Sequence, residues 1–102
     1  MKNIVVLFNL KPGVDSDAYE QWAKSTDLPI VNALESIDKF EVFKTSGLLG
    51  SDEPAPYQYV ELLAINDFDK FGENVSTDTM KNVAAEFQEF ADAPLFVTLE
   101  SI

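Results

Sequence analysis

The chain contains no cysteine and no histidine. These two absences exclude disulfides, thiolate nucleophiles, zinc sites built from Cys and His, haem ligation by histidine and every Ser-His-Asp triad. Any metal site would need carboxylates and other oxygen ligands, which suit Mg, Ca or Mn better than Zn. We therefore expect no metal centre and no cofactor in this protein.

Basic residues are also scarce: 7 Lys and Arg stand against 18 Asp and Glu, which gives a net charge of −11. Nucleic acids and anionic membranes require a positively charged surface, so we expect neither as a partner. Strong acidity is also found in disordered chains. Here 46% hydrophobic and 12% aromatic residues favour a packed globular domain instead.

Long hydrophobic runs are missing as well. The apolar stretch at residues 4–8 is too short to span a membrane, and no signal-peptide cleavage region follows it. We therefore expect a cytoplasmic protein. The 102 residues contain no repeat, linker or low-complexity tract, and they suffice for one core of modest size. We predict a single domain over residues 1–102.

Runs of β-branched and aromatic residues predict four strands, at residues 3–10, 38–45, 57–65 and 95–102. Helical spacing predicts a first helix at about residues 15–25, a break near Asp27, and a short turn to about Leu34. A second helical region begins near Asn66, restarts at Ser76 or Asp78, and ends at Pro94. The glycine- and proline-rich residues 46–56 indicate an exposed loop, which is a candidate lid.

This order of elements, βαββαβ, predicts an α+β ferredoxin-like fold. Its right-handed crossovers place both helices on one face of a four-stranded antiparallel sheet. A sheet with one solvated face should alternate apolar and polar residues, but the strands at 3–10 and 95–102 are apolar on both faces. A second copy of the chain is the simplest cover for the face without helices. We predict a homodimer with a closed, barrel-like interface.

Several motifs support this prediction by resemblance. They are the strand Val5–Phe8 followed by Lys-Pro-Gly-Val-Asp at 11–15, then Tyr19-Glu20-x-Trp22, Asp27-x-Pro29-x-Val31, and the stretches 37–43 and 57–65. The chain resembles the dimeric α/β-barrel superfamily over essentially its whole length, and it looks most like the RedY-like proteins of prodiginine pigment biosynthesis. The resemblance implies action on an aromatic or polyketide-like compound in a cavity between sheet and helices. Many members are cofactor-independent monooxygenases, isomerases or cyclases, and others have no established activity.

One position departs from related patterns. Members of the ethyl-ether-degradation type commonly carry His-x-Pro at the end of the first helix, where this chain has Asp27-Leu28-Pro29. An aspartate can still transfer protons, but its ordinary pKa lies near ~3.9 rather than ~6.5. Asp27 can therefore act as a base at neutral pH only if it is desolvated or lies near another carboxylate.

Asp27 and Glu61 are the leading catalytic candidates. Asp27 is either a general base or hydrogen-bond anchor for a substrate N–H, or simply a cap for the helical turn that follows it. Glu61, between two apolar residues of a strand, is either partly buried with a raised pKa or a charge on an edge strand. If the two share a cavity, they repel, and one holds a proton near neutral pH. They could instead hold a divalent ion.

Other side chains complete the predicted site. Tyr59 is the third catalytic candidate, because its phenol can donate to a carbonyl or stack on a flat ligand. The predicted ligand-binding residues are Asn9, Trp22, Thr26, Phe43 and Phe96. For each of them an ordinary role in the core or at the sheet margin is the alternative.

Three functions are compatible with these residues. The first is a small enzyme of prodiginine-like secondary metabolism that binds an aromatic or pyrrole intermediate and promotes acid/base-assisted condensation or cyclisation. It would be a cofactor-independent cyclase, dehydratase or monooxygenase. The second is a non-catalytic dimer that carries a hydrophobic intermediate. The third is a structural interaction domain whose cavity is filled by side chains.

Overall fold

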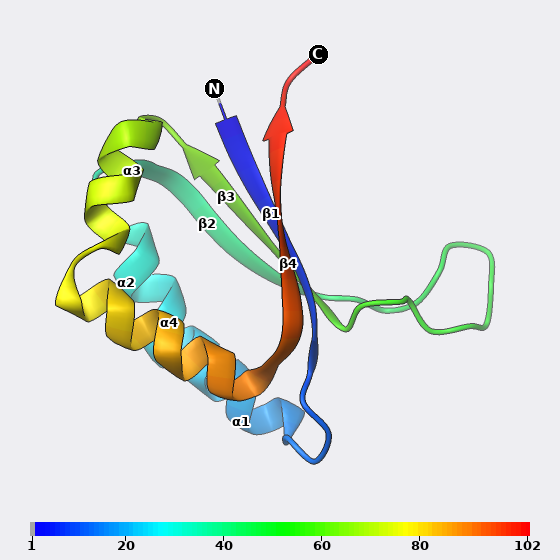
Figure 1. The fold of residues 1–102 in the computed structure, drawn as a ribbon. Helices are drawn as coiled ribbons and strands as arrows, with labels where there is room; N and C mark the ends of the chain where they lie inside the picture. The colour runs from blue at the N-terminus through cyan, green and yellow to red at the C-terminus, as the bar shows by residue number, and fades with distance from the viewer. Residues whose placement is uncertain (1) are drawn as a thin grey trace.

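The computed structural model describes residues 2–102. Its elements, in chain order, are β1 (Lys2–Leu10), α1 (Ser16–Trp22), the π-helical turn η1 (Ala23–Asp27), α2 (Leu28–Asn32), β2 (Ile37–Lys44), β3 (Tyr59–Ile65), α3 (Phe68–Val75), α4 (Asp78–Phe90) and β4 (Ala91–Glu100). The strands form one antiparallel sheet in the order β2-β3-β1-β4. The helices cover one face of this sheet (Figure 1). The predicted βαββαβ ferredoxin-like fold is confirmed.

Two apolar clusters fill the space between the sheet and the helices. One surrounds Phe8, Tyr19 and Phe87, and the other surrounds Val31 and Ile65. Alternation along the strands explains which residues enter them, because successive side chains point to opposite faces of a sheet. None of the helices within residues 2–102 combines the length and apolar character needed to cross a membrane.

The break expected near Asp27 is not present. Instead α1 continues through the π-helical turn η1 into α2, and the N–H of Leu28 donates to the carbonyl of Ala23, five residues back. Proline at position 29 has no N–H to donate, so a regular α-helical ladder would be interrupted there. The wider turn takes in an extra residue and keeps the helical path continuous. Asp27 is the last residue of this turn.

The second correction concerns the last strand. The sequence predicts a helix that runs to Pro94, but α4 ends at Phe90 and β4 begins directly at Ala91. Pro94 therefore lies inside a strand. It is tolerated because β4 is at the edge of the sheet and because the ladder with β1 shifts register nearby, between Leu7 and Asn9. Ala93, with a φ of 43°, belongs to the same irregularity.

The connection between β2 and β3 projects away from the helices (Figure 1). Asn9 fixes its base: its side-chain amide donates to the carbonyl of Pro56 at 3.2 Å, and its oxygen accepts from the N–H of Gln58 at 2.9 Å. Thr45 adds a hydroxyl bond to the carbonyl of Tyr57 at 2.7 Å. Residues 46–56 thus form a projecting arm with a fastened base.

The sheet face opposite the helices is apolar and open to solvent. Strand register places Leu62 of β3, Val5 of β1 and Val97 of β4 side by side on this face. Leu95, with 47% of its surface exposed, and Leu99 extend the patch along β4. An exposed apolar patch of this kind is typical of a surface that binds another molecule.

Candidate functional site

A pocket of about 260 Å³ lies between the helices and the sheet. Helices α3 and α4 contribute apolar side chains such as Phe71, Met80 and Phe87, and the sheet contributes Val6 and Leu63. Two lining side chains are polar, and both are acids: Asp27 and Glu61. The structure therefore brings together the two carboxylates that the sequence singled out.

Asp27 reaches the pocket from the end of η1. Its side chain is buried, with only 5% of its surface exposed, and it makes no capping hydrogen bond to α2. The interpretation of Asp27 as a helix cap is therefore wrong. Burial alone raises the pKa of its carboxyl group to about 7, because desolvation penalises the charged form.

Glu61 reaches the same pocket from β3, where it pairs with Val6 of β1 and Val42 of β2. Since β3 has a neighbour on each side, the interpretation of Glu61 as an edge-strand charge is also wrong. Burial raises its pKa to about 8, and the nearby charge of Asp27 acts in the same direction. The Tyr19 hydroxyl donates to Glu61 Oε2 at 3.4 Å, a long bond that partly offsets this rise.

Burial and proximity together control the protonation of the two acids. Burial raises the pKa of both carboxyl groups, and the charge of Asp27 further opposes the ionisation of Glu61. Near neutral pH the pair therefore retains at least one proton. A carboxyl pair that retains a proton in this way has the groups needed for a general acid and a general base. The arrangement can move a proton to one atom of a ligand and remove a proton from another.

Tyr19 is a member of this site that the sequence did not reveal. In the sequence Tyr19 stands out only as part of a motif, and in the structure its side chain is fully buried. Its hydroxyl nevertheless supports Glu61, and burial raises the pKa of this phenol far above its usual range, so it remains a donor. The signal was available in the spacing of Tyr19, Ala23 and Asp27, since residues four apart share a helix face.

Comparison with known proteins bears on this geometry. A family model described as REDY-like protein HapK matches residues 2–102. The chain belongs to the REDY-like HapK family. Among solved structures, HapK from Hahella chejuensis is 28% identical and superimposes with a TM-score of 0.78, covering 100% of this chain and 93% of its own. The resemblance to RedY-like proteins is thereby confirmed.

Solved structures with lower sequence identity share the fold of this chain. A protein from Arabidopsis thaliana is 18% identical with a TM-score of 0.81, covering 100% of this chain and 96% of its own. A dimeric ferredoxin-like protein of unknown function from Thermobifida fusca is 14% identical with a TM-score of 0.75, covering 98% and 90%. No curated protein sequence matches the chain.

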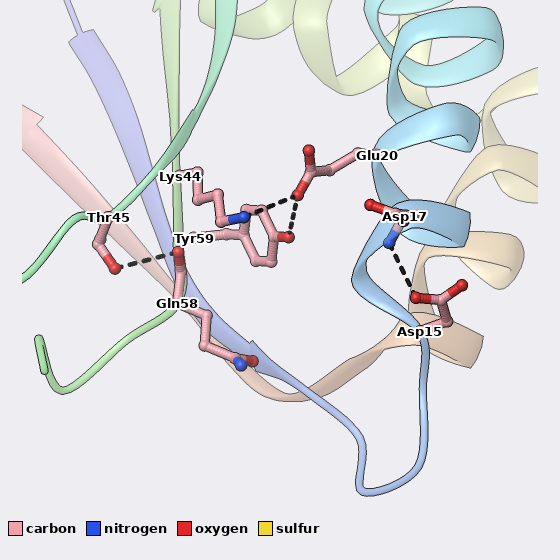
Figure 2. A network of polar contacts seen from close by, with 7 residues as sticks. All are labelled: Asp15, Asp17, Glu20, Lys44, Thr45, Gln58 and Tyr59. Carbon is pink, nitrogen blue, oxygen red and sulfur yellow. Dashed lines mark hydrogen bonds and ion pairs between the residues drawn. The ribbon is translucent and has the colours of Figure 1, made fainter.

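Tyr59 does not join the two acids. The ring of Tyr59 is buried and stacks on the ring of Phe8, with the two ring centroids 5.5 Å apart. Its hydroxyl donates to Glu20 Oε2 at 2.7 Å, and the ammonium of Lys44 lies 3.6 Å from the same oxygen (Figure 2). Tyr59 lies on the same strand face as Glu61, two residues earlier in β3, and it does not line the pocket that holds the two acids.

The predicted ligand-binding residues separate into two groups. Phe96 lines the pocket, with 64% of its surface exposed and its ring 6.5 Å from that of Phe87. The others do not line it. Asn9 fastens the base of the arm, Trp22 donates to Glu86 Oε1 at 2.9 Å, and Thr26 contacts the hydroxyl of Ser25. Phe43 pairs with Val60 on the outer face of the sheet.

Two further expectations can be compared with the pocket. The arm at residues 46–56 contributes no lining residue and projects away from the helices, so it is not a lid for this pocket within one chain. Over residues 2–102, Asp and Glu side chains nowhere gather in a group of three or more that could hold a metal ion. Asp27 and Glu61 are thus a pair without a third acidic ligand.

Proposed function

We propose that this protein is a small cytoplasmic enzyme of prodiginine-like secondary metabolism. It binds an aromatic or pyrrole intermediate and promotes an acid/base-assisted condensation or cyclisation. The observation that carries the proposal is the presence of Asp27 and Glu61 in one otherwise apolar pocket. Membership in the REDY-like HapK family and the RedY-like motifs support the class of pathway.

The proposed mechanism uses Asp27 in its ionised form and Glu61 in its protonated form. The Asp27 carboxylate removes a proton from the carbon or nitrogen of the attacking group as the new bond forms. Glu61 gives its proton to the carbonyl oxygen of the other reactant, which becomes a hydroxyl group. Asp27 then returns its proton to this hydroxyl group, which leaves as water. Glu61 then takes the last proton from the product, and both acids return to their starting states. Holding both reactants in a small dry pocket contributes a large part of the acceleration.

The apolar outer face of the sheet supports a second part of the proposal, a homodimer. Leu62, Leu95 and Val97 form an exposed patch that a second copy would bury by two-fold symmetry. The dimeric state of the Thermobifida fusca protein, which shares the fold, agrees with this arrangement. The pocket lies on the other face of the sheet, so dimerisation leaves it accessible.

The test uses a reaction that needs both an acid and a base. Pyrrole-2-carbaldehyde and a second, alkylated pyrrole condense with loss of water to a dipyrromethene, which is followed by its visible absorption. We expect the protein to accelerate this reaction, and Asp27→Asn to reduce the rate by about 100-fold or more. Glu89→Gln, which removes one exposed charge from α4, should leave the rate unchanged.

A non-catalytic carrier is the alternative. It would bind the pyrroles without accelerating their condensation, and Asp27→Asn would then change only the affinity. Binding without turnover by the wild-type protein, across a panel of pyrrole aldehydes, would replace the enzyme proposal with the carrier.

A further inference from the structure

The charge of the pocket restricts what it can bind. Only 5% of the surface of Asp27 is exposed. Burial is the cause that raises the pKa of its carboxyl group. It forms no cap with α2, and no ion pair within residues 2–102 involves it. Burying a charged carboxyl group without a partner costs free energy. A carboxyl group of this kind that lines a pocket would therefore be stabilised by a ligand that carries a positive charge or donates hydrogen bonds.

Within residues 2–102, no basic side chain lines the pocket that holds the two acids. The groups that face them are the Tyr19 phenol from α1 and apolar side chains from β1, β2, β3, β4, α2, α3 and α4. The ion pair between Glu20 of α1 and Lys44 of β2 lies outside the pocket. Any compensating cation must therefore come from the ligand.

We infer that this pocket selects a planar aromatic monocation, such as a protonated nitrogen heterocycle or an amidinium. Its N–H groups lie against the carboxyls of Asp27 and Glu61 and its ring against Phe96. The inference rests on the proposed function, because it uses the same pocket, and it adds the charge of the substrate. Planar N–H donors can pair with a carboxylate through two parallel bonds, which gives both strength and orientation. The exposed ring of Phe96 at the pocket provides a face for a flat cation.

Binding of such a cation also changes the protonation of the pair. A monocation balances the charge of one carboxylate, so it favours the singly ionised state of Asp27 and Glu61 over the doubly protonated state. Cation binding at neutral pH is therefore accompanied by proton release to the buffer. A neutral ligand of the same shape leaves the proton in place.

The experiment compares benzamidine, benzamide and benzoate, which share one ring size and differ in charge. Calorimetric titration in two buffers of different ionisation enthalpy gives both the affinity and the number of protons released. We expect benzamidine to bind at least about tenfold more tightly than benzamide, with proton release, and benzoate to bind most weakly. Asp27→Asn and Glu61→Gln should each remove most of the preference for the cation.

Controls separate the pocket from the acidic surface. Glu89→Gln removes a charge outside the pocket and should retain the full preference for benzamidine. Equal binding of benzamidine and benzamide overturns the inference, as does a preference that survives Asp27→Asn or an absence of binding by all three probes. Because the pyrrole condensation is measured separately, an active enzyme without cation preference would contradict this inference alone.

Discussion

The carboxyl groups of Asp27 and Glu61 line one pocket from opposite walls, although one ends a π-helical turn and the other lies in an inner strand. Each is desolvated by the same apolar surroundings, and the charge of Asp27 further raises the pKa of Glu61. This relationship is the basis of the proton transfer proposed for the pocket.

The first prediction concerns stability and pH. The pKa of Glu61 rises from its ordinary 4.5 to about 8 in the folded protein. The folded state therefore binds the proton more tightly than the unfolded state. This stabilisation is fully present below the ordinary pKa and is lost as the pH rises toward about 8. The wild-type protein should thus lose stability between about pH 5 and pH 8.

Glu61→Gln isolates the contribution of this residue, because glutamine can still accept the Tyr19 hydroxyl but cannot ionise. We expect the variant to exceed the wild type in free energy of unfolding by about 1–3 kcal/mol near pH 8.5, with the difference shrinking toward pH 5. Urea denaturation at several pH values measures it. A difference independent of pH would contradict a raised pKa at Glu61.

The second prediction tests Tyr19 as a positioning residue. Its hydroxyl bond lowers the pKa of Glu61, so Tyr19→Phe should raise that pKa further. The bond is long, and we expect a loss of stability of no more than about 1 kcal/mol. Infrared or carbon NMR titration of the Glu61 carboxyl group detects the shift. Tyr59→Phe, which removes a hydroxyl bonded to Glu20 instead, is the matched control and should leave the Glu61 titration unchanged.

The third prediction separates two phenylalanines that the sequence treated alike. Phe96→Ala should weaken the binding of aromatic ligands by about tenfold, because a stacked aromatic contact is worth roughly 1 kcal/mol beyond its buried area. Phe43→Ala should not, since Phe43 lies on the outer face of the sheet. Fluorescence or calorimetric titration with one aromatic probe compares the two. Equal losses would mean that the ligand binds elsewhere.

The fourth prediction concerns assembly. Val97→Asp places a charge in the centre of the apolar outer face and should convert a dimer to a monomer at micromolar concentration, because burying an unpaired carboxylate is unfavourable. Light scattering coupled to gel filtration measures the mass. Leu49→Asp changes a fully exposed leucine of the arm and should leave the dimer intact. A wild-type protein that is monomeric would remove the homodimer from the proposal.

The sequence determined the fold because its signals are local and agree with one another. Runs of β-branched and aromatic residues specify the strands, apolar residues at helical spacing specify the helices, and the order of these elements leaves few topologies. The same patterning indicated an uncovered apolar face. It misplaced the start of β4, because the shifted register with β1 and the edge position that accommodate Pro94 arise from strand pairing rather than from the residues nearby.

The site could be predicted only in part, since a sequence names chemical groups but not their neighbours. The Asp-x-Pro motif at the expected helix break pointed to Asp27, and the apolar neighbours of Glu61 in its strand pointed to Glu61. That they meet in one pocket depends on the π-helical turn that carries Asp27 inward and on the inner position of β3. The same packing turned Tyr59 toward Glu20 and Tyr19 toward Glu61. Desolvation is a property of the assembled core, so tertiary structure alone decided which of the 18 acidic residues hold protons near neutral pH.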